Sequence, residues 1–208
     1  LLALAGGAAA WWPLRGWQPS REQWPVQGVE VGEDDGPIDW TALKTIGVDF
    51  AYVDASASVF ARDANFTANL EGARAVGLQV GAVHEYDPCQ PADKQAANFV
   101  TVVPRDARLL PSAVSLDRLA EDCPGKVTEA LSRFDPDGLP TGKPVILKLG
   151  PKFQDRYHVA SAVNRNLWLV RTRFEPDYAG RPWALWTANG ALKTEAAEKP
   201  LRWLAAQR

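Results

Sequence analysis

The stretch Leu110-Pro-Ser-Ala-Val-Ser-Leu-Asp117 has the pattern of a short buried strand. A proline stands near its start, small and apolar residues fill its middle, and an acidic residue ends it. Because alternate side chains of a strand share a face, Ala113, Ser115 and Asp117 point one way and the residues between them point the other. In parallel α/β barrels, catalytic side chains collect at the C-terminal ends of the strands. What this protein does therefore depends on the chemistry left to Ser115 and Asp117.

Other strand candidates alternate with helical periods on both sides of this stretch. The apolar and β-branched runs predict strands at 27–31, 49–54, 78–84, 143–148, 167–171 and 183–187. Helices are predicted at 39–46, 65–76, 95–103, 128–134 and 152–162. The tail, 193–208, is predicted to be a polar connection followed by a helix with Leu201, Trp203 and Leu204. Such alternation is typical of a parallel α/β sheet, which we expect to be closed into a barrel resembling a TIM barrel.

The composition indicates one soluble domain and excludes a basic binding surface. The chain has 208 residues, of which 46% are hydrophobic and 23% charged, and a net charge of −2. Without a positive field, nucleic acid is not an expected partner. Nine tryptophans fit core packing first, and a sugar-stacking cleft or an interfacial belt as alternatives.

Residues 1–12 are small and apolar and end in Trp11-Trp12, and the sequence contains no methionine. Twelve residues are too few to span a bilayer of ~30 Å. We interpret them as the tail of a truncated signal peptide or membrane anchor, which places Trp11, Trp12 and Trp17 near the headgroups; a buried N-terminal helix is the alternative. Residues 13–26 are predicted to be a linker, and residues 27–208 the barrel. This organisation predicts a periplasmic or otherwise extracytoplasmic protein tethered to the inner membrane.

The order of several motifs resembles a known family. Gly28-Val-Glu-Val31, Gly36-Pro-Ile-Asp-Trp40, Asp49-Phe-Ala-Tyr-Val53, Ala75 to His84, and Trp183-Ala-Leu-Trp186 follow one another as they do in glycoside hydrolase family 25, the muramidase-type lysozymes. The resemblance covers about residues 27–192. It implies a flattened (β/α) barrel that hydrolyses the β-1,4 bond between N-acetylmuramic acid and N-acetylglucosamine. It also implies peptidoglycan glycan strands as the partner and no metal or organic cofactor.

The two cysteines, Cys89 and Cys123, resemble a pair found in the Gram-negative branch of this family. Both follow predicted strand ends by a few residues, and an exported chain permits a disulfide between them. Two unrelated buried thiols are the alternative.

The acidic residues depart from the family pattern. Glu30 stands where the family has Asp, and Ser115-Leu116-Asp117 replaces Asp-x-Glu, whose Glu is the general acid. Ala57 replaces a Glu of the second strand, and a late Asp-x-Asn motif is missing, with only Glu195 and Glu198 near its place. Glycoside hydrolysis normally takes two carboxyl groups at a set separation, one of them protonated near neutral pH. Asp in place of Glu retracts a carboxyl by ~1.5 Å, and a misplacement of about 1 Å can cost ~10²-fold in rate.

Three carboxylates remain as catalytic candidates, namely Asp117, Glu30 and Glu85, the last of which could supply a carboxyl that the family lacks. Each has a plain alternative: a capping acid for Asp117, a salt-bridged barrel residue for Glu30, and a solvated rim residue for Glu85. The candidates for substrate binding are Tyr52, His84, Trp168 and Trp186, which as readily belong to the core. Asp54 is expected to pair with a basic residue.

Two functions follow from this pattern. The first is a peptidoglycan muramidase with an altered carboxylate set and weak turnover. The second is a non-catalytic relative that binds glycan strands or a protein partner through the same rim. The replaced acids favour the second.

Overall fold

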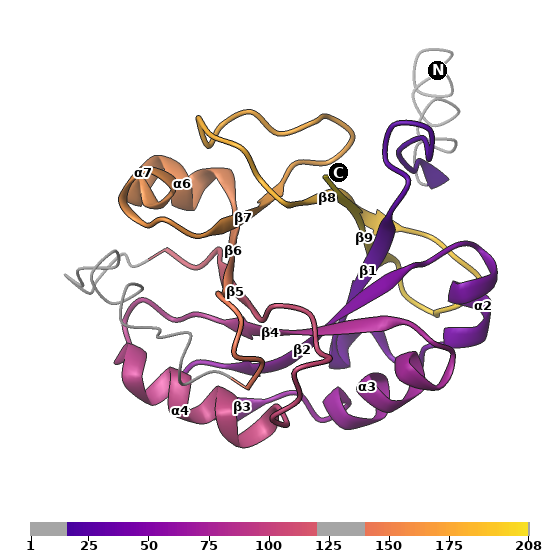
Figure 1. Cartoon of the computed structure of the whole chain (residues 1–208), viewed down its shortest axis with the longest axis horizontal. Helices are drawn as coiled ribbons and strands as arrows, with labels where there is room; N and C mark the ends of the chain where they lie inside the picture. The colour runs from indigo at the N-terminus through magenta and orange to yellow at the C-terminus, as the bar shows by residue number, and fades with distance from the viewer. Residues whose placement is uncertain (1–15, 120–139, 208) are drawn as a thin grey trace, which may run out of the picture.

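A computed structural model describes residues 16–119 and 140–207, and these residues form a closed barrel (Figure 1). The strand order is β1-β9-β8-β7-β6-β5-β4-β2-β3, and β1 also pairs with β2, which closes the ring and leaves β3 outside it. The strands are β1 Gln27–Val31, β2 Phe50–Ala57, β3 Ala61–Arg62, β4 Gln79–Glu85, β5 Ala113–Leu116, β6 Ile146–Leu149, β7 Asn166–Val170, β8 Leu185–Leu192 and β9 Leu201–Ala206.

The strands of the ring are parallel except for β9. Each of the neighbouring pairs from β1 through β2, β4, β5, β6 and β7 to β8 is parallel, whereas β9 runs antiparallel to both β1 and β8. The C-terminal ends of the parallel strands therefore meet at one mouth of the barrel, where the start of β9 joins them. The predicted α/β barrel is confirmed, but its sheet is mixed.

Alternate residues of the strands separate two apolar layers. The barrel interior is filled by a group that includes Tyr52, Ala113, Trp168 and Leu204. The opposite faces pack against the surrounding elements in a larger outer core. On β5, Ala113 belongs to the interior while Val114 and Leu116 belong to the outer core, as the alternation predicted.

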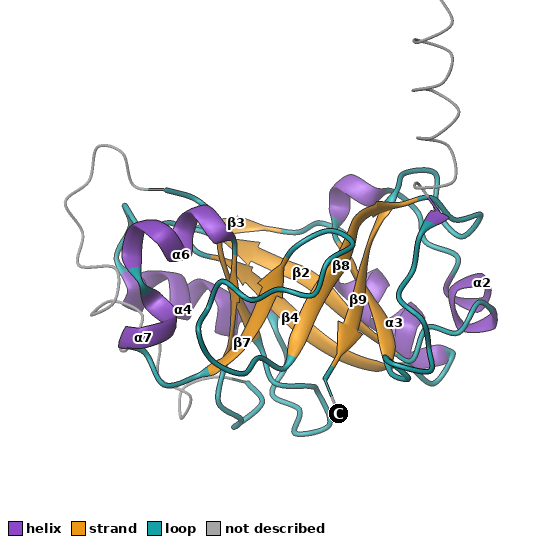
Figure 2. Ribbon diagram, turned by 90° about the horizontal axis from the view of Figure 1, so that it is seen from above, coloured by secondary structure: helices purple, strands orange, loops and turns teal. Residues whose placement is uncertain are grey.

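Helices cover part of the outside of the ring (Figures 1 and 2). Helices α3 and α4 pack on β2, and α6 and α7 lie near β6 and β7. Asp39 caps α2 by accepting a hydrogen bond from the backbone N–H of Ala42 at 2.9 Å. The helical elements are η2 Glu33–Asp35, α2 Trp40–Thr45, α3 Phe66–Ala75, α4 Ala92–Val102, α6 Pro151–Tyr157 and α7 Val159–Ala162.

Two expectations for secondary structure were wrong. The predicted C-terminal helix is strand β9, because pairing with β1 and β8 overrides the helical propensity of its Leu and Ala residues. The single helix predicted at 152–162 is two helices, since His158 adopts a left-handed conformation with φ of 49° between α6 and α7. The helix predicted at 128–134 lies outside the described residues.

The segment 16–26, expected to be a linker, packs on the barrel through two tryptophans. Trp24 stacks on Trp183 with ring centroids 5.4 Å apart, and Trp17 lies 6.3 Å from Trp186 of β8. The side-chain amide of Gln27 donates to the backbone carbonyls of Pro19 and Trp24. This segment therefore covers β8 where no helix does so in the described part of the chain.

Residues 1–12 and Cys123 lie outside the described residues. The membrane anchor and the disulfide between Cys89 and Cys123 therefore stay predictions. None of the helices in the described ranges has the length and apolar character needed to cross a membrane.

Candidate active site

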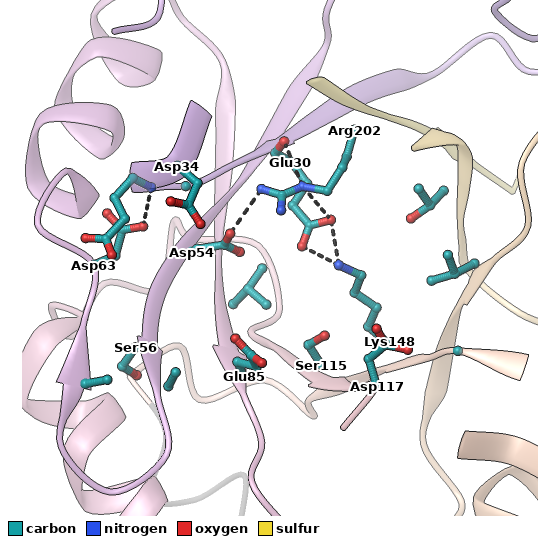
Figure 3. A pocket seen from close by; sticks show the side chains of 18 of the residues that line it. Glu30, Asp34, Asp54, Ser56, Asp63, Glu85, Ser115, Asp117, Lys148 and Arg202 are labelled. Carbon is teal, nitrogen blue, oxygen red and sulfur yellow. Dashed lines mark hydrogen bonds and ion pairs between the residues drawn. The ribbon is translucent and has the colours of Figure 1, made fainter. Parts of the chain in front are cut away.

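A pocket of about 470 Å³ opens at the mouth where the parallel strands end (Figure 3). Its walls come from strands all round the ring and from the loops that follow them. Seven carboxylates and three cationic side chains line it, namely Glu30, Glu33, Asp34, Asp54, Asp63, Glu85 and Asp117, with Arg62, Lys148 and Arg202. The three catalytic candidates, Glu30, Glu85 and Asp117, all line this pocket, and so does Ser115.

The strand register sets the order of side chains on one wall. Glu85 of β4 stands beside Ser115 of β5, and Ser115 stands beside Lys148 of β6. Asp117 follows β5 by one residue, on the same side as Ser115. Glu85, Ser115 and Lys148 thus lie at the same level on three adjacent strands, and Asp117 lies two residues beyond Ser115.

An ion pair crosses the mouth of the barrel. Lys148 Nζ lies 2.5 Å from Glu30 Oε1 and 2.7 Å from Glu30 Oε2. β6 is four strands from β1 in either direction round the ring, so this pair joins opposite walls. Glu30 is 1% exposed and the side chain of Lys148 13%, so the pair is shielded from water.

Arg202 of β9 extends the ion pair into a network. Its guanidinium lies 3.4 Å from Glu30 Oε2, 3.0 Å from Asp54 Oδ2 and 3.1 Å from Asp35 Oδ2. Asp35 also accepts from the backbone N–H of Gly32. The basic partner expected for Asp54 is therefore Arg202. The sequence did not predict this partner, because Arg202 lies in the segment that was expected to be a helix and is strand β9.

The network pushes the pKa values of Glu30 and Asp54 apart. Burial alone would raise the pKa of Glu30, but Lys148 and Arg202 outweigh it and hold that pKa below its ordinary value. Burial and the Glu30 anion raise the pKa of Asp54 to about 7, against the opposing pull of Arg202 and Lys148. Glu30 is thus the ionised carboxylate, and Asp54 the carboxyl that can carry a proton near neutral pH.

The interior aromatic residues support the floor of the pocket. Lys148 Nζ lies 4.9 Å from the ring centroid of Trp168, a cation–π distance. Trp168 donates from Nε1 to Thr187 Oγ1 at 2.7 Å and packs on Tyr52 with centroids 5.0 Å apart. Tyr52 in turn donates to the carbonyl of Pro111 at 3.0 Å.

None of the four residues predicted to bind substrate lines this pocket. Tyr52 and Trp168 fill the barrel interior beneath it. His84 is fully buried between Ser56 Oγ and Gln95 Oε1, and burial lowers its pKa to about 4. Trp186 is 3% exposed and packs in the outer core. All four therefore match the core alternative, and their role in substrate binding is a proposal without support from this pocket.

Asp117 and Glu85 stand at the exposed rim of the same pocket (Figure 3). Neither side chain makes an ion pair or hydrogen bond within residues 16–119 and 140–207. The carboxylate of Asp117 lies against Gly150, where an added Cβ would stand 2.5 Å from Asp117 Oδ1. Gly150 therefore leaves the space that Asp117 occupies.

Sequence reasoning missed the two cations at the centre of the pocket. Lys148 ends the predicted strand 143–148 and lies next to the last residue of β6, and a polar residue at that position was a signal for the mouth of the barrel. Arg202 gave no such signal, because its segment was expected to be helical.

The arrangement combines a shielded anion, a carboxyl with a raised pKa and free carboxylates at the rim, which are the ingredients of acid–base chemistry on a glycosidic bond. The described residues contain no group of three or more His, Cys, Asp or Glu placed to hold a metal ion. Comparison with known proteins agrees with this site: the family model for glycosyl hydrolases family 25 matches residues 29–192. The chain belongs to glycosyl hydrolase family 25.

Solved structures of a family 25 glycosyl hydrolase and of a bacterial lysozyme share the fold. A family 25 glycosyl hydrolase from Bacillus anthracis aligns with a TM-score of 0.82 and 24% identity, covering 93% of each chain. A bacterial lysozyme from Streptomyces coelicolor aligns with a TM-score of 0.71 and 19% identity, covering 88% of this chain and 92% of the lysozyme.

This chain matches a smaller part of the length of its sequence relatives. Lysozyme M1 of Streptomyces globisporus is 30% identical over 96 residues, which is 44% of this chain and 33% of that lysozyme. The uncharacterized protein YegX of Escherichia coli K12 is 26% identical over 189 residues, 85% of this chain and 67% of YegX. The chain thus matches about a third of the first relative and two thirds of the second.

Proposed function

We propose that this family 25 chain is a lysozyme-like domain directed at peptidoglycan, in which glycan binding persists and turnover is weak or lost. The family match supports the substrate class, and the pocket at the barrel mouth supports a cleft open to a glycan strand. Because peptidoglycan lies outside the cytoplasm, the proposal includes an extracytoplasmic location. It also includes a membrane tether formed by residues 1–12.

One observation carries the loss of turnover: Glu30 is held by Lys148 and Arg202. The transition state of glycoside hydrolysis is oxocarbenium-like and develops positive charge. An anion already neutralised by two cations cannot stabilise that charge, and the Lys148 ammonium in the same floor opposes it. The buried carboxylate at the family's first-strand position therefore braces the barrel mouth instead of serving the reaction.

A second function, residual muramidase activity, is favoured by a different observation. Asp54 lies in the pocket with its pKa raised to about 7, so a fraction of it is protonated at neutral pH. It could donate a proton while Asp117 or Glu85 acts as the second carboxylate. Asp54 pairs with Arg202, however, so its proton is available only when that contact loosens.

Digestion of purified peptidoglycan, with the released muropeptides separated and weighed, tests turnover. We expect a rate at least ~10³-fold below a typical muramidase, since a misplaced acid costs ~10² and the lost neighbouring charges need supply only about another tenfold. Wild-type turnover near that of an active muramidase, abolished by Asp117→Asn, would contradict the proposal that turnover is weak or lost. Residual turnover abolished by Asp54→Asn but kept by Asp117→Asn would assign the proton to Asp54.

Co-sedimentation with insoluble peptidoglycan tests binding in parallel. We expect the wild-type chain in the pellet, and a variant with an obstructed pocket, Ser115→Trp, in the supernatant. An exposed substitution of the same kind on α3, Glu71→Trp, is the control and should pellet like the wild type. A wild-type chain that stays in the supernatant removes the glycan from the function and leaves a protein-binding role for the rim.

A further inference from the structure

We propose that a groove beside the candidate active site binds the acidic stem peptide of peptidoglycan, so that the chain prefers glycan whose peptides carry free carboxylates. The groove has a volume of about 630 Å³ and lies between the β2–β3 hairpin and α4 (Figure 1). This inference rests on the proposed function and names the part of the substrate that the chain selects.

The groove is positively charged, in contrast to the neighbouring pocket. Arg62 and Lys94 line it, and neither makes an ion pair within residues 16–119 and 140–207. No Asp or Glu of these ranges lines the groove, whereas seven carboxylates line the pocket. An anionic group from solution is therefore the complementary partner of the groove.

The guanidinium of Arg62 is held in place by a buried residue of α4. Asn98, which is 6% exposed, accepts from Arg62 Nε at 3.3 Å and donates to the backbone carbonyl of Ala61 at 3.0 Å. In the described part of the chain, this leaves the two terminal amino groups of Arg62 without a partner. Such a fork of donors matches the two oxygens of a carboxylate. Arg62 is thus positioned to bind a carboxylate of the ligand.

An exposed aromatic ring stands at the tip of the hairpin beside these cations. Phe60 is 77% exposed, the most exposed large apolar side chain in the described ranges. It lines the groove together with Val59, Pro91 and Ala97. Covering such a surface with apolar groups of a ligand is favourable. A stem peptide offers both kinds of group, since it combines alanine methyl groups with free carboxylates, whereas a bare glycan strand does not.

The groove and the pocket share a wall. Arg62 lines both of them, and Ala57 and Ala61 of the same hairpin line the pocket. The stem peptide branches from the lactyl group of muramic acid, so it leaves the glycan sideways. Because Arg62 borders both cavities, a peptide needs only a few residues, each spanning up to ~3.6 Å, to pass from a sugar in the pocket into the groove.

Two muropeptides that differ only in charge test the groove. Each is the disaccharide tetrapeptide that muramidase digestion leaves, with its peptide carboxylates free in one probe and amidated in the other. Binding to the full chain is measured by calorimetry at pH 7. We expect the free-acid probe to bind at least ~10-fold more tightly, since a hydrogen bond between charged groups contributes about that factor. The preference should shrink when salt is raised from 50 to 500 mM.

Charge substitutions then assign the preference to the groove. Arg62→Gln with Lys94→Gln should bring the two affinities together. Lys44→Gln with Lys199→Gln deletes the same charge at exposed positions outside both cavities and should keep the preference. Circular dichroism confirms that both double variants fold.

A substitution of the exposed ring tests the apolar contact. Phe60→Ala should weaken both muropeptides by roughly three- to tenfold and leave the preference between them unchanged. Phe174→Ala is the control, because it removes a ring that is 66% exposed and lines neither cavity. Wild-type affinities in the Phe60→Ala variant would contradict the placement of the peptide in this groove.

The remaining outcomes separate this inference from the proposed function. Equal affinity for the two muropeptides, unaffected by Arg62→Gln with Lys94→Gln, would overturn the peptide groove, while co-sedimentation with peptidoglycan would still support the proposed function. A preference that the free tetrapeptide alone reproduces, without co-sedimentation, would overturn the proposed function and leave a groove for acidic peptides.

Two further results would count against the groove. Binding of phosphatidylglycerol vesicles that the same double variant abolishes, with muropeptide binding unchanged, would assign the two cations to a membrane surface and overturn the inference. No binding of any muropeptide or of peptidoglycan would overturn both the inference and the proposed function.

Discussion

Lys148 Nζ lies 2.7 Å from Glu30 Oε2, although β6 and β1 stand on opposite sides of the barrel mouth. A buried pair of this kind costs desolvation on both partners, and its loss from one side leaves a bare charge. The contact therefore has consequences for stability as well as for the chemistry of the pocket.

Replacing Lys148 by Met should destabilise the fold by about 3 kcal/mol, because it leaves Glu30 buried with Arg202 as its nearest cation. Urea unfolding measures this. Adding Glu30→Gln should recover much of the loss, giving a coupling of about 2 kcal/mol in a double-mutant cycle. Lys152→Met, at an exposed position of α6, is the control and should change stability little. Strictly additive single variants would show that the ion pair contributes nothing.

The proton on Asp54 should make the stability pH-dependent in an identifiable direction. The folded pKa of Asp54, about 7, lies above its ordinary value of 3.8, so the folded state binds more protons between these values. Stability from this group is full below about pH 4 and is lost as the pH rises through about 7. The measurement is the unfolding free energy of the wild type minus that of Asp54→Asn, followed from pH 4 to 8. This difference should fall as the pH rises, because only the wild type loses the contribution of Asp54.

His84 acts in the same range with the opposite sign, which is why the difference between variants is needed. Its folded pKa, about 4, is below the ordinary 6.5, so its contribution is lost as the pH falls from about 6.5 through about 4. Because Asp54→Asn leaves His84 in place, the His84 contribution cancels in the comparison. A difference that stays flat from pH 4 to 8 would mean that Asp54 is ionised throughout.

Trp24→Ala should destabilise the protein by about 2 kcal/mol, since the ring stacks on Trp183 and meets Trp186 edge-on at 5.6 Å. Thermal and urea unfolding report the change. Phe60→Ala removes an aromatic ring that is 77% exposed and should cost less than about 0.5 kcal/mol. Equal effects of the two substitutions would show that segment 16–26 does not stabilise the barrel.

Restoring the family's carboxylates with Glu30→Asp, Ser115→Asp and Asp117→Glu should raise turnover on peptidoglycan by at least about tenfold. The shorter residue at position 30 draws its carboxylate back from Lys148, and the longer one at 117 extends the acid toward the scissile bond. The same triple change with Gln at position 117 is the control and should stay inactive, as muropeptide release will show. If the restored variant gains nothing, the barrier lies in Lys148 or in the missing late Asp.

The strands, and the side of the sheet to which their side chains point, could be predicted from the sequence, and so could part of the site. On β5 the alternation of small and apolar residues placed Ser115 and Asp117 on the pocket side. The tail could not be predicted in this way, because its Leu and Ala residues suit a helix and only the distant strands β1 and β8 make it a strand. The place of Arg202 in the pocket could not be predicted for the same reason, since Arg202 lies on this strand. The aromatic candidates failed for a related reason, since a buried Trp or Tyr and a sugar-binding one have the same local pattern.

Strand β9 lies between β1 and β8, and Arg202 reaches Glu30 across 172 positions of the chain. During synthesis, β1 leaves the ribosome long before β9, its second neighbour, has been made. Until β9 is made, β1 and β8 each have one unpaired edge. A nascent chain that stops before Leu201 has every other strand of the ring but lacks β9, which joins β8 to β1. Arg202, at the centre of the pocket, is thus translated after every other strand of the ring, and a chain truncated before Leu201 would expose the edges of β1 and β8 and be prone to aggregation.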